Sequence, residues 1–292
     1  MTFRGVGTAL VTPFTATGAL DERALQRFVD FQIEGGVNFL VPCGTTGENP
    51  TLSPVEHRRV VEIVVKQARG RVPVLAGAGS NSTAKAIELS KDAIDLGADG
   101  ILTITPYYNK PTPDGLRRHF GLQAEAVEKL KPRFPMIMYN VPGRTGVNMT
   151  AATTLQIARE VPNVIGIKEA SGMMEQILEI LRARPKGFLV LSGDDAWALP
   201  LMAAGAEGVI SVASNEVPAL MRKLVDERSI EILNRLLPLL VGNFIESNPT
   251  PVKTALKMMG VLESDTVRPP LAPMTDANRT KLEAILRECG VL

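Results

Sequence analysis

The 292-residue sequence contains few of the residues that hold metals or form disulfides. It has two cysteines, Cys43 and Cys289, and two histidines, His57 and His119. Two cysteines are too few for a disulfide framework or a cysteine metal site, and two histidines leave little for zinc. We therefore expect no metal centre, and the cytoplasm is the simplest compartment.

The sequence also lacks a charge excess and long apolar runs. Its formal net charge is +1, with no basic tract or acidic tail, so nothing electrostatic suggests nucleic acid or an anionic membrane surface. No apolar run approaches the roughly 18 residues of a membrane-spanning helix. The opening segment, MTFRGVGTALVTPF, is too polar and interrupted for a signal peptide, and we interpret it as a first strand.

What is present is an alternation of short apolar runs with longer helical patterns. Amphipathic segments such as 22–36 and 83–98 separate the runs, and Ser53-Pro54-Val55-Glu56 forms a helix-starting capping box. Eight runs have strand character: 6–12, 38–44, 72–79, 100–106, 135–141, 164–170, 188–194 and 208–214.

Repeated glycine-rich helix ends before nearly continuous apolar strands indicate a parallel sheet. Eight such units predict a closed (β/α)₈ barrel, the TIM barrel. A doubly wound open sheet is the alternative, but no G-x-G-x-x-G follows a strand. We expect residues 1–227 to form the barrel and residues 228–292 a helical extension packed on it.

Chemistry in such a barrel is found at the carboxyl ends of the strands. Hydroxyls, one lysine and one arginine are expected to converge there. No paired histidine–carboxylate set occurs, which disfavours a metal-dependent aldolase or hydrolase, and no G-x-S-x-G elbow occurs. The residues at these ends are Thr45, Thr46, Tyr108, Tyr139, Arg144, Lys168 and Ile210.

Lys168 is unusual because it lies near the end of the otherwise apolar run VIGIKEA. Alternation puts it on the face of Val164 and Gly166, and Gly166 would leave room for a long side chain. Burial disfavours the charged form of an amine, and a neutral amine can attack a carbonyl to form a Schiff base. The alternative is a lysine whose ammonium reaches water at a strand end.

The other candidates also have structural interpretations. Buried tyrosines often only fill space, although all three in this chain fall at strand ends. A Thr-Thr pair often caps a helix, and Arg144 could form an ordinary ion pair. Cys43 is expected to be a small buried side chain and His57 a surface or interface residue.

Four motifs carry a resemblance over nearly the whole chain. GTTGE (44–48), YNVPGRTG (139–146), GIKEASG (166–172) and GVISV (208–212) occur in this order. They resemble the dihydrodipicolinate synthase, or 4-hydroxy-tetrahydrodipicolinate synthase, family. The resemblance implies a class I, pyruvate-dependent lyase on a (β/α)₈ barrel in lysine and diaminopimelate biosynthesis.

The resemblance also implies a role for each candidate. Lys168 matches the Schiff-base lysine, and Tyr139 matches the residue that moves protons at the bound pyruvate. Thr45 and Tyr108 match its relay partners, with Tyr108 arriving from a neighbouring subunit. Three further positions match substrate contacts: Thr46 for the pyruvate carboxylate, Ile210 for a backbone contact to pyruvate, and Arg144 for the carboxylate of the second substrate.

The implied partners are pyruvate, L-aspartate 4-semialdehyde and further copies of the chain, in a homotetramer built as a dimer of dimers. No cofactor is implied, because the lysine iminium itself accepts the electrons. A tyrosine with a pKa near 10 is a poor unaided proton carrier, so a chain of hydroxyls fits the role. An arginine can bind a carboxylate with paired hydrogen bonds.

Two alternatives share parts of this pattern. N-acetylneuraminate lyase and 2-keto-3-deoxy sugar-acid aldolases use the same lysine and tyrosine, but Arg144 within YNVPGRTG favours an acidic amino-aldehyde over a sugar. A non-catalytic barrel that senses a keto acid would be expected to lose Lys168 or Tyr139, and both are present.

One departure concerns regulation. Lysine-inhibited members of the family often carry an acidic residue where this chain has Lys85, and Asn49, Pro50 and Pro54 also differ from that pocket. His57, Asn81 and Tyr107 match it. A cation at Lys85 would repel the ammonium groups of L-lysine, so we expect weak inhibition or none.

Overall fold

The computed structural model describes residues 3–292. All eight predicted strands are present, each within or close to its predicted range. Each strand is shorter than predicted, because only part of the apolar run pairs with its neighbours. The strands are β1 (Gly5–Ala9), β2 (Phe39–Val41), β3 (Leu75–Gly77), β4 (Gly100–Ile104), β5 (Met136–Asn140), β6 (Val164–Glu169), β7 (Leu189–Ser192) and β8 (Gly208–Ser211).

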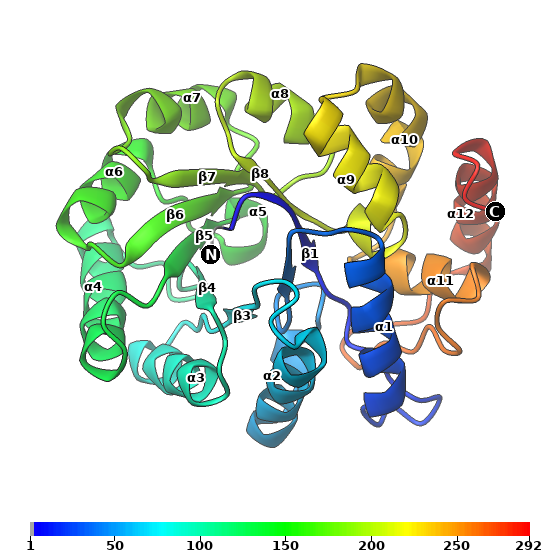
Figure 1. Ribbon diagram of the computed structural model, residues 1–292, viewed down its shortest axis with the longest axis horizontal. Helices are drawn as coiled ribbons and strands as arrows, with labels where there is room; N and C mark the ends of the chain where they lie inside the picture. The colour runs from blue at the N-terminus through cyan, green and yellow to red at the C-terminus, as the bar shows by residue number, and fades with distance from the viewer. Residues whose placement is uncertain (1–2) are drawn as a thin grey trace.

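The strands form one parallel sheet in the order β2-β1-β8-β7-β6-β5-β4-β3. A parallel bridge between Leu40 and Val74 joins the two outermost strands, and the Leu40 N–H donates to the Pro73 carbonyl at 3.0 Å. The sheet is therefore a nearly closed barrel, as the sequence predicts, with its helices in a ring around it (Figure 1).

Helices connect the strands and continue past the last one. The predicted capping box is present at the start of α2, where Ser53 and Glu56 exchange side-chain and backbone hydrogen bonds. The helices are α1 (Glu22–Glu34), α2 (Pro54–Ala68), α3 (Thr83–Asp95), α4 (Pro113–Leu130), α5 (Pro142–Thr145), α6 (Ala151–Glu160), α7 (Met174–Ala183), α8 (Ala198–Ala203), α9 (Pro218–Glu227), α10 (Ile230–Gly242), α11 (Thr250–Met258) and α12 (Asp276–Glu288), with the short 3₁₀ turns η1 (Asn49–Thr51) and η2 (Ala213–Asn215).

Two apolar clusters stabilise the barrel. The larger lies between the strands and the surrounding helices. The smaller fills the interior and consists of Phe3, Ala9, Phe39, Val41, Leu75, Leu102, Ile137, Tyr139, Val141, Leu189, Leu191 and Ile210. Phe3 and Phe39 pack edge to face with ring centroids 5.5 Å apart. Because Phe3 precedes β1 and Phe39 begins β2, these rings fill the amino-terminal end and leave the carboxyl end for polar groups.

Helices α10–α12 lie at one side of the barrel, beside α9 (Figure 1). Helix α10 contacts α9, and α11 contacts η2 directly after β8. We refer to residues 228–292 as the extension, and its separation from the barrel at residue 227 stays a prediction.

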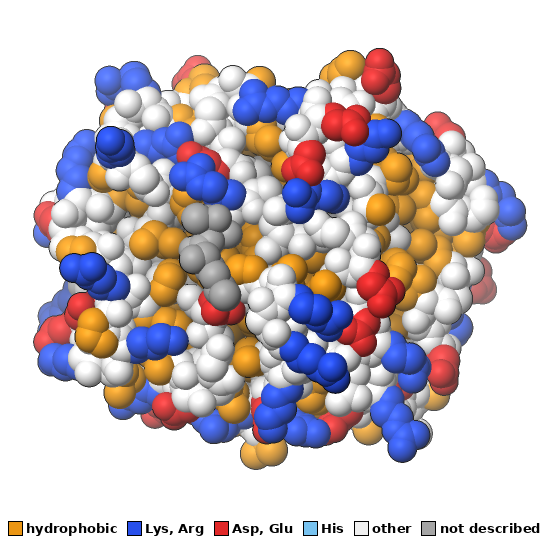
Figure 2. Space-filling view, viewed as in Figure 1, with side chains coloured by type: hydrophobic (Ala, Val, Ile, Leu, Met, Phe, Trp, Pro, Cys, Tyr) orange, Lys and Arg blue, Asp and Glu red, His pale blue; other side chains and the backbone are white. Residues whose placement is uncertain are grey.

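Charged side chains of both signs are interspersed over the face seen in Figure 2, with apolar side chains between them. This distribution agrees with the net charge of +1. None of the helices in the described part of the chain is both long and apolar enough to cross a membrane.

Candidate active site

Lys168 lies inside the barrel, one residue before the end of β6. It is in register with Tyr139 of β5 and Leu191 of β7, and it is only 6% exposed. Its side chain is therefore largely enclosed by the protein, which argues against a lysine that extends freely into water. Among residues 3–292 it has no ion-pair partner and donates no hydrogen bond. An unpaired buried lysine is costly, so its presence requires another explanation.

The prediction that Lys168 shares a face with Val164 is wrong. The pairing of β5 with β6 shifts register between Met136 and Ile137, which is the signature of a β-bulge. Val164 consequently packs in the outer cluster, while Ile165 packs against the interior cluster. The bulge changes which side chains of β6 point into the barrel. A prediction that assumes strict alternation of side chains along the strand could not reveal this change.

The predicted role of Gly166 also needs correction. A Cβ atom there would lie 2.7 Å from Cβ of Leu189 and 2.8 Å from its carbonyl oxygen, so this glycine allows β6 and β7 to approach. The glycine that makes room for the lysine is Gly193, where a Cβ atom would lie 3.0 Å from Cε of Lys168.

Tyr139 is the immediate neighbour of Lys168. The lysine Nζ lies 4.2 Å from the centroid of the tyrosine ring, within the range of a cation–π contact. Tyr139 is 6% exposed. The structure thus brings an amine and a phenol together at the carboxyl end of the barrel.

Thr45 and Thr46 lie in the loop of residues 44–48, which we call the GTTGE loop. The Glu48 N–H donates to the Thr45 carbonyl at 3.1 Å and closes this turn after β2. Thr45 is half-buried. Thr46 is 2% exposed, and its Oγ1 accepts a hydrogen bond from Nδ2 of Asn248 at 3.0 Å.

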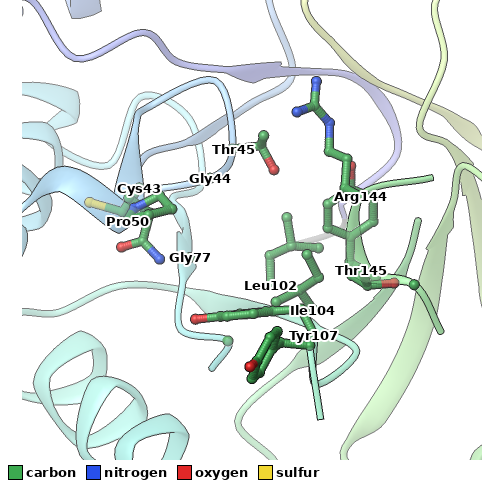
Figure 3. Close-up of a pocket in the computed structure, with 15 residues that line it drawn as sticks. Cys43, Gly44, Thr45, Pro50, Gly77, Leu102, Ile104, Tyr107, Arg144 and Thr145 are labelled. Atoms are coloured by element: carbon green, nitrogen blue, oxygen red, sulfur yellow. The ribbon is translucent and has the colours of Figure 1, made fainter. Parts of the chain in front are cut away.

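A cavity of about 520 Å³ opens beside these residues. Figure 3 shows Thr45 on one side of it and Arg144 on another, with Leu102 and Ile104 below them in this view. Lys168, Thr46 and Ile210 are not part of its wall and are almost fully buried. The wall consists of Cys43, Gly44, Thr45, Asn49, Pro50, Gly77, Gly79, Leu102, Ile104, Tyr107, Tyr108, Tyr139, Arg144, Thr145 and Gly146.

Arg144 and Tyr108 lie at the rim of the cavity. Arg144 belongs to the short helix α5 directly after β5, is exposed, and has no acidic partner within the described residues. The ordinary ion pair considered for it is therefore absent from the described structure. Tyr108 has a left-handed backbone with φ of 72° and is 88% exposed, so its hydroxyl is not enclosed by the site of one chain.

The predictions for Cys43 and His57 have opposite outcomes. Cys43 is buried, as predicted, and burial raises the pKa of its thiol. His57 is not a surface residue: it is 3% exposed, and its Nε2 lies 2.9 Å from the Gly77 carbonyl oxygen. Burial is the main cause that lowers its pKa. The described residues contain no cluster of three or more His, Cys, Asp or Glu side chains placed to hold a metal ion.

Sequence reasoning missed the contacts that the extension makes with the GTTGE loop. Asn248 reaches Thr46, and Lys253 forms a buried ion pair with Glu48 at 2.5 Å. These partners are 202 and 205 residues apart in the chain. The one available signal is a charged Lys253 within the helical run TPVKTALKM.

Comparisons with known proteins cover the whole chain. A sequence model of the Dihydrodipicolinate synthetase family matches residues 2–289. A 4-hydroxy-tetrahydrodipicolinate synthase of Oleidesulfovibrio alaskensis is 51% identical over 100% of both chains. The chloride-inhibited dihydrodipicolinate synthase of Acinetobacter baumannii, solved with pyruvate, is 42% identical over 100% of both chains, with a TM-score of 0.95. A structure described as the first monomeric dihydrodipicolinate synthase variant is 42% identical and has a TM-score of 0.94, covering 99% of this chain and 98% of that one.

Proposed function

The chain belongs to the dihydrodipicolinate synthetase family, and we propose how its residues perform the reaction of that family. It is an enzyme, a lyase with the activity of a 4-hydroxy-tetrahydrodipicolinate synthase. The substrates are pyruvate and L-aspartate 4-semialdehyde, and the reaction serves lysine and diaminopimelate biosynthesis. The observation that carries our account is the buried, unpaired amine of Lys168 beside the ring of Tyr139.

Lys168 acts as the nucleophile. Its neutral amine adds to the carbonyl carbon of pyruvate, and loss of water from the carbinolamine gives an iminium. The iminium draws electrons from the pyruvate methyl group, which loses a proton to become an enamine. The enamine carbon attacks the aldehyde, and the amino group of the semialdehyde then displaces Lys168 and closes the ring. Among residues 3–292 no carboxylate forms an ion pair with this amine, which leaves it free for the attack.

Tyr139 moves protons on and off the reacting oxygen and carbon, with Thr45 and Tyr108 as relay partners. Tyr139 and Thr45 line the cavity of their own chain. The exposed Tyr108 side chain completes the relay in a neighbouring copy, so the enzyme acts as an oligomer, a homotetramer formed from two dimers. One structural neighbour is described as the first monomeric variant of a dihydrodipicolinate synthase. That description supports an oligomeric enzyme, because it treats the monomer as the exception. Full activity in a monomeric fraction would contradict this part of the proposal.

The remaining site residues bind substrate. Thr46 holds the pyruvate carboxylate and Ile210 contributes a backbone contact. Arg144 receives the carboxylate of the semialdehyde, which its exposed and unpaired guanidinium at the cavity rim supports. We also place the enzyme in the cytoplasm, where its two unpaired and buried cysteines would remain reduced.

Turnover of pyruvate with the semialdehyde, followed by mass spectrometry of the cyclic product, tests the proposal. We expect Tyr139→Phe to lower kcat by about 10²–10⁴-fold, because a general acid–base group is lost. Its melting temperature should change little, since the ring remains. Pyruvate with N-acetylmannosamine is the control reaction and should give no product. Unchanged turnover in Tyr139→Phe would contradict the role of this residue.

A further inference from the structure

The extension holds a buried ion pair whose position is not explained by stability. Lys253 of α11 and Glu48 of the GTTGE loop are each 0% exposed, with Nζ and Oε1 2.5 Å apart. Desolvating two charges costs roughly what their attraction returns, so apolar residues would often serve stability equally well. A pair of this kind is better explained by the geometry that it fixes.

Every polar atom of this pair has a partner. The second carboxylate oxygen of Glu48 accepts the Arg268 N–H at 2.9 Å, and Nζ of Lys253 also donates to the Thr266 carbonyl at 2.8 Å. Two cations contact the ring of Phe14: the lysine Nζ lies 4.1 Å and the Arg268 guanidinium carbon 4.2 Å from its centroid. The carboxylate of Glu48 is therefore held by Lys253 and Arg268, which both lie outside its own loop.

Glu48 is also the residue at which the GTTGE loop turns. Its backbone is left-handed, with φ of 53° and ψ of 35°, which is uncommon for a residue other than glycine and persists only when its surroundings enforce it. Its N–H closes the turn onto Thr45. Five residues before Lys253, Asn248 holds the Thr46 hydroxyl. The extension thus contacts the GTTGE loop at two positions, Thr46 and Glu48.

We propose that Glu48 and Lys253 are positioning residues for pyruvate: the pair holds the GTTGE loop in the shape that presents the hydroxyls of Thr45 and Thr46 to the substrate. Neither side chain lines the cavity, so both act through the threonines. This inference rests on the proposed function, because it assigns the carboxylate of pyruvate to Thr46.

A matched control lies at the other end of the barrel. Arg184 and Glu207 form an ion pair at 2.7 Å with side chains 20% and 12% exposed, and Glu207 also accepts the Val190 N–H at 2.9 Å. Glu207 precedes β8 at the amino-terminal end, away from the GTTGE loop. Its neutralisation should affect stability without affecting pyruvate.

The test uses Glu48→Gln, Lys253→Met, the double variant and Glu207→Gln. Each is measured for its melting temperature and, by titration calorimetry, for its Kd for pyruvate. The double variant carries no uncompensated buried charge, so we expect it to be more stable than Lys253→Met. We nevertheless expect its Kd for pyruvate to be raised about tenfold, because the loop is no longer held. Glu207→Gln should lower the melting temperature and leave the Kd unchanged.

An unchanged Kd in the double variant would overturn the inference. Loss of folding in the double variant would also overturn it, because the pair would then serve the fold itself. A wild-type chain that binds pyruvate but does not condense it with the semialdehyde would contradict the proposed function. The comparison of Kd values would still decide whether the ion pair positions the loop for pyruvate. A wild-type chain that does not bind pyruvate would contradict both.

Discussion

Two buried lysines have opposite surroundings in this molecule. Lys253, between the extension and the GTTGE loop, is fully buried and has both a carboxylate and a carbonyl as partners. Lys168, inside the barrel, is 6% exposed and has neither among the described residues. Instead, its amine faces a tyrosine ring next to a cavity. The paired lysine fixes the position of a loop, whereas the unpaired one is available to react.

Replacing Lys168 gives the largest effect that this comparison predicts. Lys168→Met removes the nucleophile, so we expect kcat to fall at least about 10³-fold. Stability should stay the same or rise, because a buried polar amine with no hydrogen-bond partner among the described residues is replaced by an apolar side chain of similar length. Steady-state turnover and urea unfolding measure the two quantities. A large loss of stability would mean that Lys168 is structural.

Replacing Lys253 should have the opposite effect, with a large loss of stability and retained Schiff-base formation. Lys253→Met leaves the Glu48 carboxylate buried and without its cation, which costs about 3–5 kcal/mol of unfolding free energy. The variant should still form the Schiff base at saturating pyruvate and low temperature, because Lys168 is intact. Urea unfolding at neutral pH measures the loss. A variant as stable as the wild type would show that this pair is not held as tightly as its geometry indicates.

His119 is a further buried base, and its burial predicts acid sensitivity. Burial lowers its pKa from 6.5 to about 4. Between these values the unfolded chain binds a proton that the folded chain excludes, so stability is lost as the pH falls from 6.5 to 4. The contribution is about 3 kcal/mol at most. It should disappear in His119→Leu, measured by urea unfolding at pH 7, 5.5 and 4, whereas the pyruvate Kd at pH 7 should not change. An unaltered pH dependence in this variant would assign the acid sensitivity to other groups.

The smallest effect concerns the exposed Lys85 at the start of α3. Its ammonium would repel the ammonium groups of L-lysine bound beside it. We therefore expect L-lysine to inhibit weakly or not at all, measured as initial rate against L-lysine concentration. Lys85→Glu is the matched variant and should increase any inhibition. Strong inhibition of the wild type at modest L-lysine would contradict this expectation.

Local patterns in the sequence predicted the barrel and the residues at its carboxyl end. Eight apolar runs became eight strands because a strand buried on both faces needs little beyond apolar residues. The resemblance supplied the roles, and the structure places Lys168 beside Tyr139. Thr45, Tyr108 and Arg144 meet around one cavity.

What could not be predicted depends on packing between distant segments. The bulge at the start of β6 follows from pairing with β5, and the space beside Lys168 comes from Gly193, directly after the next strand. His57 was expected at the surface or an interface from its place near a helix start, but its ring is buried within the chain itself against the Gly77 carbonyl. The contact of Lys253 with Glu48 joins residues 205 positions apart, and a charged residue within a helical run does not reveal so distant a partner.

Incubation with pyruvate and borohydride, followed by peptide mapping, tests the contrast between the two lysines most directly. Borohydride reduces a Schiff base to a stable secondary amine, so the modified residue can be identified by mass spectrometry. We predict a pyruvate-dependent adduct on Lys168 and none on Lys253, which serves as an internal control within the same molecule. An unmodified Lys168 in folded protein, or an adduct on Lys253 instead, would contradict the account.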